Sequence, residues 1–125
     1  MRALFVDDEV EFLELMEKRL TRRGMDVVTA PDGQAALAVL DQAIQSGEMF
    51  QIVVMDVRMP GMDGLETLRH MKEKAPNLPV ILLTGHACMG VAVQGLDLGA
   101  YDYMLKPVAI SELIIKMEEA ARSAV

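Results

Sequence analysis

The sequence predicts an α/β protein built on a doubly wound, five-stranded parallel sheet. Short runs rich in β-branched residues and leucine alternate five times with longer segments in which apolar residues recur at helical spacing. Three of the short runs are almost wholly apolar, as expected of strands buried on both faces. A length of 125 residues suits one hydrophobic core, so we expect residues 1–125 to form a single domain.

The short runs give the expected strands. In chain order they are Ala3–Val6, Asp26–Thr29, Gln51–Met55, Pro79–Leu83 and Tyr101–Leu105. The first, third and fourth are the most apolar, which favours central positions in the sheet for these three strands.

Apolar stripes at helical spacing predict a covering helix after each strand. The stripes are Val10, Leu13, Met16 and Leu20 in the first helix, Ala36, Leu40, Ala43 and Ile44 in the second, Leu65, Leu68 and Met71 in the third, and Ile110, Leu113, Ile114 and Met117 in the fifth. The fourth helix is expected roughly over residues 91–98. It is the weakest, because Gly90 and Gly95 each cost about 1 kcal/mol relative to alanine within a helix.

Turn residues mark several helix ends. Gly24, Gly47 and Gly99 stand where the first, second and fourth helices should close. The tripeptide Pro31-Asp32-Gly33 is typical of a turn that starts a helix, here the second one.

The composition excludes several classes of function. Nineteen acidic against twelve basic residues give a net charge of −7, which repels phosphate backbones, and five aromatic residues without tryptophan are too few for a base-stacking surface. A single cysteine, Cys88, can form neither an internal disulfide nor a cysteine-based zinc site. Apolar runs stay below the roughly 18 residues needed to cross a bilayer. We therefore expect a cytoplasmic protein that binds neither nucleic acid nor membrane.

Polar side chains follow four of the five predicted strands. They are Asp7 and Asp8 after the first, Asp56 after the third, Thr84 after the fourth and Lys106 after the fifth. Each residue, considered alone, has an ordinary explanation. Asp8 could form a capping box with Glu11, and Thr84 could cap a helix. Together they stand at the edge of an open α/β sheet where ligands bind.

This set of residues suits phosphoryl chemistry with a divalent ion. Three carboxylates close together repel one another unless a cation lies among them, and Mg²⁺ prefers such oxygen ligands together with phosphate oxygens. Asp56, held by a buried strand, is the candidate nucleophile. Lys106 and Thr84 could then stabilise the phosphoryl oxygens.

The same residues, in this order, make the chain similar to the receiver domain of two-component response regulators. The matching segments are residues 6–9 (VDDE), 54–64 (VMDVRMPGMDG), 83–85 (LTG) and 99–107 (GAYDYMLKP). They extend over essentially the whole chain. The resemblance implies a flavodoxin-like fold with strand order 2-1-3-4-5 and five helices on the two faces of the sheet.

The resemblance also implies a mechanism. Asp56 would accept a phosphoryl group from a sensor histidine kinase or a histidine phosphotransfer protein, so the chain would be a phosphoacceptor switch and not an enzyme with a separate substrate. Asp8, Asp56 and the backbone carbonyl of Arg58 would ligate Mg²⁺ directly, and Asp7 would act through a bound water. Lys106 and Thr84 would hold the phosphoryl oxygens, and the peptide bond from Lys106 to Pro107 would be cis.

Signalling would follow from movement around Thr84. The resemblance implies that Tyr103 turns inward as Thr84 moves toward the phosphoryl group, and that the face formed by the fourth helix, fifth strand and fifth helix repacks. This face would signal to an output domain or effector protein, or form a phosphorylation-linked dimer. Arg58 and His86 occupy positions at which the family varies the lifetime of the phosphoryl group.

Three alternatives fit the residues less well. A magnesium-dependent phosphatase of the haloacid-dehalogenase type would also use Asp56 as nucleophile, but it needs a second aspartate where Arg58 stands. A flavodoxin-like cofactor carrier needs a Ser/Thr-rich phosphate loop in place of Asp7 and Asp8. The pair Gly90 and Gly95 has the spacing of a P-loop but lacks the lysine that should follow.

Overall fold

The computed structural model describes residues 1–58 and 61–124. Met59, Pro60 and Val125 lie outside the described residues, and the first two of these belong to the receiver-like segment 54–64. The elements in chain order are β1 (Arg2–Val6), α1 (Val10–Thr21), β2 (Asp26–Ala30), α2 (Gly33–Ser46), β3 (Ile52–Asp56), α3 (Gly64–Lys74), β4 (Val80–Thr84), the 3₁₀ turn η1 (His86–Cys88), α4 (Met89–Asp97), β5 (Asp102–Leu105) and α5 (Ile110–Ser123).

The five strands form one parallel sheet in the order β2-β1-β3-β4-β5, which confirms the predicted fold class and strand order. The strands predicted to be central are so: every residue of β3 and β4 is buried, as are four of the five in β1. The strand order reverses between β1 and β3. An open sheet of this kind offers its ligand site beyond the carboxyl ends of these two strands.

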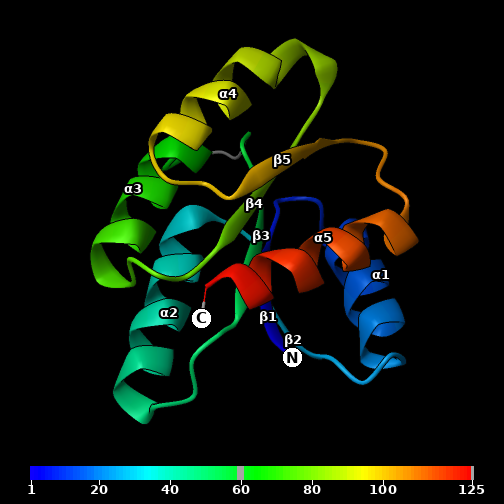
Figure 1. Cartoon of the computed structure of the whole chain (residues 1–125), viewed down its shortest axis with the longest axis vertical. Coiled ribbons are helices and arrows are strands. Elements are labelled where there is room, and N and C mark those ends of the chain that lie inside the picture. Colours follow the sequence, from blue (N-terminus) through cyan, green and yellow to red (C-terminus); the bar gives the residue numbers. More distant parts are fainter. Residues whose placement is uncertain (59–60, 125) are drawn as a thin grey trace.

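The helices cover the two faces of the sheet in unequal numbers (Figure 1). Helices α2, α3 and α4 pack on one face, where Leu40, Leu68 and Ala92 join a core cluster with alternate residues of the central strands. Helices α1 and α5 pack on the other face, where Leu20 and Leu113 join a second cluster. Burial of these two apolar layers holds the strand ends, and the polar residues beyond them, in place.

Two residues of the predicted apolar stripes are exposed. Val10, the first residue of α1, is 58% exposed, and Ile44, in the last turn of α2, is 42% exposed. Both predictions of burial are wrong: each residue lies in a terminal turn of its helix, and the buried residues of α1 and α2 do not include it. The remaining stripe residues of α1 and the first three of α2 are buried.

Helix ends follow local chemistry closely. Asp32 caps α2 by accepting a hydrogen bond from the backbone N–H of Ala35, as the predicted turn requires, and Asp63 caps α3 in the same way. Gly47 ends α2 with a φ of 78°, in the left-handed region that favours glycine. The fourth helix begins two residues earlier than predicted, directly after η1.

Among the described residues, none of the helices combines the length and the apolar character that a membrane span requires.

Candidate functional site

Four strands deliver their polar residues to one edge of the sheet. Asp7 directly follows β1, Asp56 and Thr84 are the last residues of β3 and β4, and Lys106 directly follows β5. Backbone hydrogen bonds fix two of these positions, since the N–H of Asp7 donates to the carbonyl of Ala30 and the N–H of Lys106 donates to that of Thr84. Parallel pairing therefore brings together residues from both ends of the chain.

The Lys106 ammonium connects the acidic residues. Its Nζ lies 2.7 Å from Oδ2 of Asp7, 3.0 Å from Oδ2 of Asp56 and 3.3 Å from Oε1 of Glu9. Asp7 and Asp56 are buried, whereas the Glu9 carboxylate is 67% exposed. Lys106 thus neutralises part of a buried negative charge that would otherwise be costly.

Three carboxylates lie close enough to share one cation. Asp7, Asp8 and Asp56 each offer an oxygen, and these oxygens lie within 4.8 Å of one another. Asp8 is exposed while the other two are buried, so the cluster opens to solvent on one side. Hard oxygen donors at an open edge fit Mg²⁺, which keeps several of its own waters.

Backbone N–H groups orient the two buried carboxylates. Oδ1 of Asp7 accepts a hydrogen bond from the N–H of Glu9, and Oδ1 of Asp56 accepts one from the N–H of Arg58, each at 2.9 Å. Glu9 occupies the N-cap position of α1. The interpretation of Asp8 as a helix cap is therefore wrong, and its exposed side chain is available to the acidic cluster.

Thr84 is fully buried at the end of β4. Its hydroxyl donates to the carbonyl of Gly85 at 3.0 Å, and Gly85 takes the N-cap position of η1. Thr84 is therefore not a helix cap. A local, single hydrogen bond leaves the hydroxyl able to rotate toward another acceptor.

Burial and ion pairing shift two pKa values in the site. Burial raises the pKa of the Asp7 carboxyl above its ordinary value, although the hydrogen bonds from Lys106 and from the backbone N–H of Glu9 work against this. Burial alone would lower the pKa of the Lys106 ammonium, but the hydrogen bonds to Asp7 and Asp56 outweigh it and raise that pKa. Lys106 is charged at neutral pH.

The profile of the response regulator receiver domain family matches residues 3–118 of the chain. The chain belongs to this family. The family match and the strand order both show the receiver fold. The alternative of a haloacid-dehalogenase-type phosphatase is not favoured.

Curated relatives of this receiver domain include transcriptional regulators. The chain is 38% identical over 122 residues to the transcriptional regulatory protein TctD of Salmonella typhimurium, which covers 98% of the chain and 52% of TctD. It is 36% identical over 115 residues to the DNA-binding transcriptional regulator NtrC of the same species, covering 92% of the chain and 24% of NtrC. The chain thus spans about half the length of one relative and a quarter of the other.

Solved receiver structures resemble nearly the whole chain. A response regulator receiver domain protein from Clostridium thermocellum superposes with a TM-score of 0.89 at 30% identity, covering 98% of this chain and 94% of that one. The receiver domain of NtrX from Brucella abortus gives a TM-score of 0.87 at 33% identity, covering 97% and 98%.

The structure also places the other residues singled out in the receiver sequence. Arg58 and His86 are both exposed, and Tyr103 is half-buried against the core cluster that includes Ala92 of α4. Cys88 is half-buried against the same cluster. The peptide bond from Lys106 to Pro107 is cis, as expected.

Sequence patterns do not indicate two of the residues around Lys106. Glu9 is part of the acidic segment but has no predicted role, and Phe12 has none either, although Nζ of Lys106 lies 4.6 Å from the centroid of its ring. The signal in the sequence is their position soon after the acidic pair, which places Glu9 at the N-cap and Phe12 in the first turn of α1.

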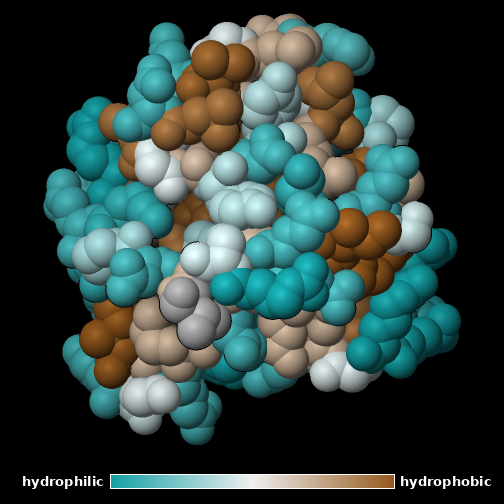
Figure 2. All heavy atoms as spheres, viewed as in Figure 1, coloured by the Kyte–Doolittle hydropathy of each residue, from teal (hydrophilic) through white to brown (hydrophobic). Residues whose placement is uncertain are grey.

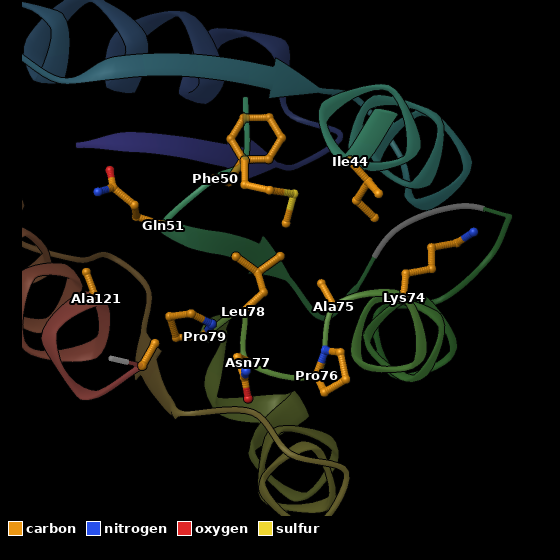
Figure 3. Close-up of a pocket in the computed structure, with 12 residues that line it drawn as sticks. Ile44, Phe50, Gln51, Lys74, Ala75, Pro76, Asn77, Leu78, Pro79 and Ala121 are labelled. Carbon is orange, nitrogen blue, oxygen red and sulfur yellow. The ribbon is translucent and has the colours of Figure 1, made fainter. Parts of the chain in front are cut away.

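An apolar pocket lies at the opposite end of the sheet (Figure 3). Its volume is about 540 Å³, and Phe50, Gln51, Leu78 and Pro79 line it at the amino ends of β3 and β4. The acidic cluster with its lysine lies beyond the carboxyl ends of the strands, so the apolar pocket plays no part in the candidate site.

Proposed function

We propose that the domain accepts a phosphoryl group on Asp56 in a Mg²⁺-dependent reaction. The observation that carries the proposal is the position of Lys106, which forms ion pairs with the buried carboxylates of Asp7 and Asp56 in a chain of the receiver family. One ammonium among three carboxylates leaves an excess of negative charge, which suits a divalent cation. The domain is then a phosphoacceptor switch and not an enzyme with a separate substrate.

In the proposed reaction a carboxylate oxygen of Asp56 forms a bond to phosphorus. The phosphorus–nitrogen bond of a phosphohistidine donor breaks, and its electron pair stays with the imidazole. Mg²⁺, bound by Asp8, Asp56 and the backbone carbonyl of Arg58 with Asp7 acting through a water, would offset the charge of the phosphoryl oxygens. Lys106 would exchange a carboxylate partner for a phosphoryl oxygen, and the hydroxyl of Thr84 would donate to another.

The proposed donor is a sensor histidine kinase or a histidine phosphotransfer protein, and the proposed receiver of the signal is an output domain or effector. Apolar side chains gather over α4 in the space-filling view (Figure 2), where Val91, Val93 and Leu96 are exposed. Several exposed apolar side chains on one helix favour a protein contact. This supports the face of α4, β5 and α5 as the output surface, with a phosphorylation-linked dimer as one form of output.

The test is intact-mass measurement after incubation with acetyl phosphate, with and without Mg²⁺. We expect the wild-type protein to gain one phosphoryl group only when Mg²⁺ is present, and Asp56→Asn to gain none. Asp63→Asn is the matched control, because Asp63 is an exposed aspartate after the same strand and asparagine caps a helix equally well. An equal gain in Asp56→Asn and wild type would refute the assignment.

A further inference from the structure

Lys106 is surrounded by side chains of one short segment. Asp7, Glu9 and Phe12 all approach its ammonium group, and all three lie between the end of β1 and the first turn of α1. Asp56 supplies the remaining ion pair from β3. The Phe12 ring is the uncharged member of this set, with its centroid 4.6 Å from Nζ, well within the distance at which a ring face attracts a cation.

The carboxylates around Lys106 have other roles in the proposed reaction besides pairing with the lysine. Asp7 and Asp56 belong to the cluster that would hold a cation, and Asp56 would carry the phosphoryl group. An aromatic ring takes no part in either step. The contact between Phe12 and Lys106 can therefore persist while the lysine exchanges its carboxylate partners for a phosphoryl oxygen.

The ring also shields the lysine side chain. Phe12 is half-buried against the core cluster under α1 and α5, and together with Lys106 it lines a groove of about 660 Å³ between α1 and the start of α5. A lysine side chain has a flexible four-carbon stem with many rotamers. A ring face beside Nζ limits this freedom and excludes water from one side of the ammonium group.

We propose that Phe12 is a positioning residue for phosphoryl transfer, which holds Lys106 in place through a cation–π contact. The proposal rests on the proposed function of Asp56 and deepens it: the speed of transfer depends on a ring that is not one of the reacting groups. Phe12 acts through its contact with Lys106.

The kinetic test compares phosphorylation rates with acetyl phosphate and Mg²⁺ for three variants. Phe12→Leu keeps an apolar side chain but removes the ring, and should slow the reaction about two- to five-fold, as expected for a cation–π pair at a partly exposed site. Phe12→Tyr keeps the ring and should restore a rate close to wild type. Phe50→Leu is the matched control, because Phe50 also lies against a cation, Arg2, but at the amino ends of the strands. It should leave the rate unchanged.

The second readout is the NMR signal of the Lys106 side-chain protons. A ring face shifts the resonances of nearby protons upfield, so this shift should be present in wild type and Phe12→Tyr and absent in Phe12→Leu. The NMR shift is measured on the unphosphorylated protein. If wild type takes up no phosphoryl group, the proposed function fails, whereas the NMR shift still reports on the contact.

Two outcomes would overturn the role of Phe12. One is a wild-type rate in Phe12→Leu with the upfield shift lost, which would mean that the contact exists but does not affect transfer. The other is an equal loss of rate in Phe12→Leu and Phe12→Tyr, which would assign the effect to packing and not to the ring. Thermal unfolding of each variant shows whether it is folded at the assay temperature.

Discussion

At the scale of single residues, the site is an unbalanced group of charges. Two buried carboxylates, Asp7 and Asp56, share the one ammonium group of Lys106, and the exposed Asp8 adds further negative charge. Burial penalises a carboxylate that is only partly compensated, which is why the pKa of Asp7 is raised in spite of the ion pair. The uncompensated negative charge thus lowers the stability of the folded domain at the place where a cation is expected to bind.

The raised pKa of Asp7 gives a pH dependence with a definite sign. The folded state holds the Asp7 proton more tightly than the unfolded state, so this group favours folding below the ordinary pKa of 3.8 and loses that contribution as pH rises through the raised value. Asp7→Asn lacks the titration. In the presence of EDTA, we expect the stability of Asp7→Asn relative to wild type to increase as pH rises from about 3 to neutral. Urea unfolding at several pH values measures the difference in unfolding free energy between Asp7→Asn and wild type. A difference that does not change with pH would contradict a raised pKa of Asp7.

At the scale of elements, α4 is attached to the sheet by very small side chains. Its buried residues are Ala92 and Gly95. The sequence marks Gly95 as a source of weakness in a helix, but the structure shows why a glycine stands there. A methyl group at this position would overlap the side chain of Leu82 in β4 and would lie 3.5 Å from Leu65. Close approach of the helix to the sheet requires a residue without Cβ.

The two glycines of α4 should therefore respond to alanine in opposite ways. Gly95→Ala should lose about 1–3 kcal/mol of stability through overpacking against Leu82. Gly90→Ala should gain up to about 1 kcal/mol, because a Cβ there meets open space and alanine favours a helix. Denaturant unfolding of both variants measures the free energies. A gain in Gly95→Ala equal to that in Gly90→Ala would show that α4 has room to move away from β4.

At the scale of the whole molecule, folding itself assembles the cation site. Asp7 and Lys106 are 99 residues apart in sequence and meet only because β1, β3, β4 and β5 run in parallel. An ion bound by this cluster binds the folded chain and not the unfolded one. Binding therefore adds to the free energy of unfolding.

We expect Mg²⁺ to raise the thermal unfolding midpoint of the wild-type domain. At a concentration tenfold above its Kd, the gain should be about 1.4 kcal/mol. Asp8→Asn should weaken this response, because it removes the exposed carboxylate of the cluster. Scanning calorimetry with MgCl₂ measures the gain, with NaCl of equal ionic strength as the control for screening. Equal stabilisation by the two salts would argue against a specific cation site.

The sequence by itself determined the fold class, the strand order expected from the family resemblance, and the identity of Asp7, Asp8, Asp56, Thr84 and Lys106 as a group. This was possible because local periodicity defines strands and helices, and because the carboxyl ends of parallel strands must share one edge of the sheet.

Only the tertiary structure decided which side chains touch within that group. It placed Phe12 and Glu9 against Lys106, left Asp8 exposed and Val10 outside the core, and brought Gly95 against Leu82. The reason is that the apolar periodicity of the sequence predicts only the face of its own helix or strand on which a residue lies. A contact between two elements depends instead on how far each extends past its neighbour and how closely the two pack, and these follow from the packing of the whole chain.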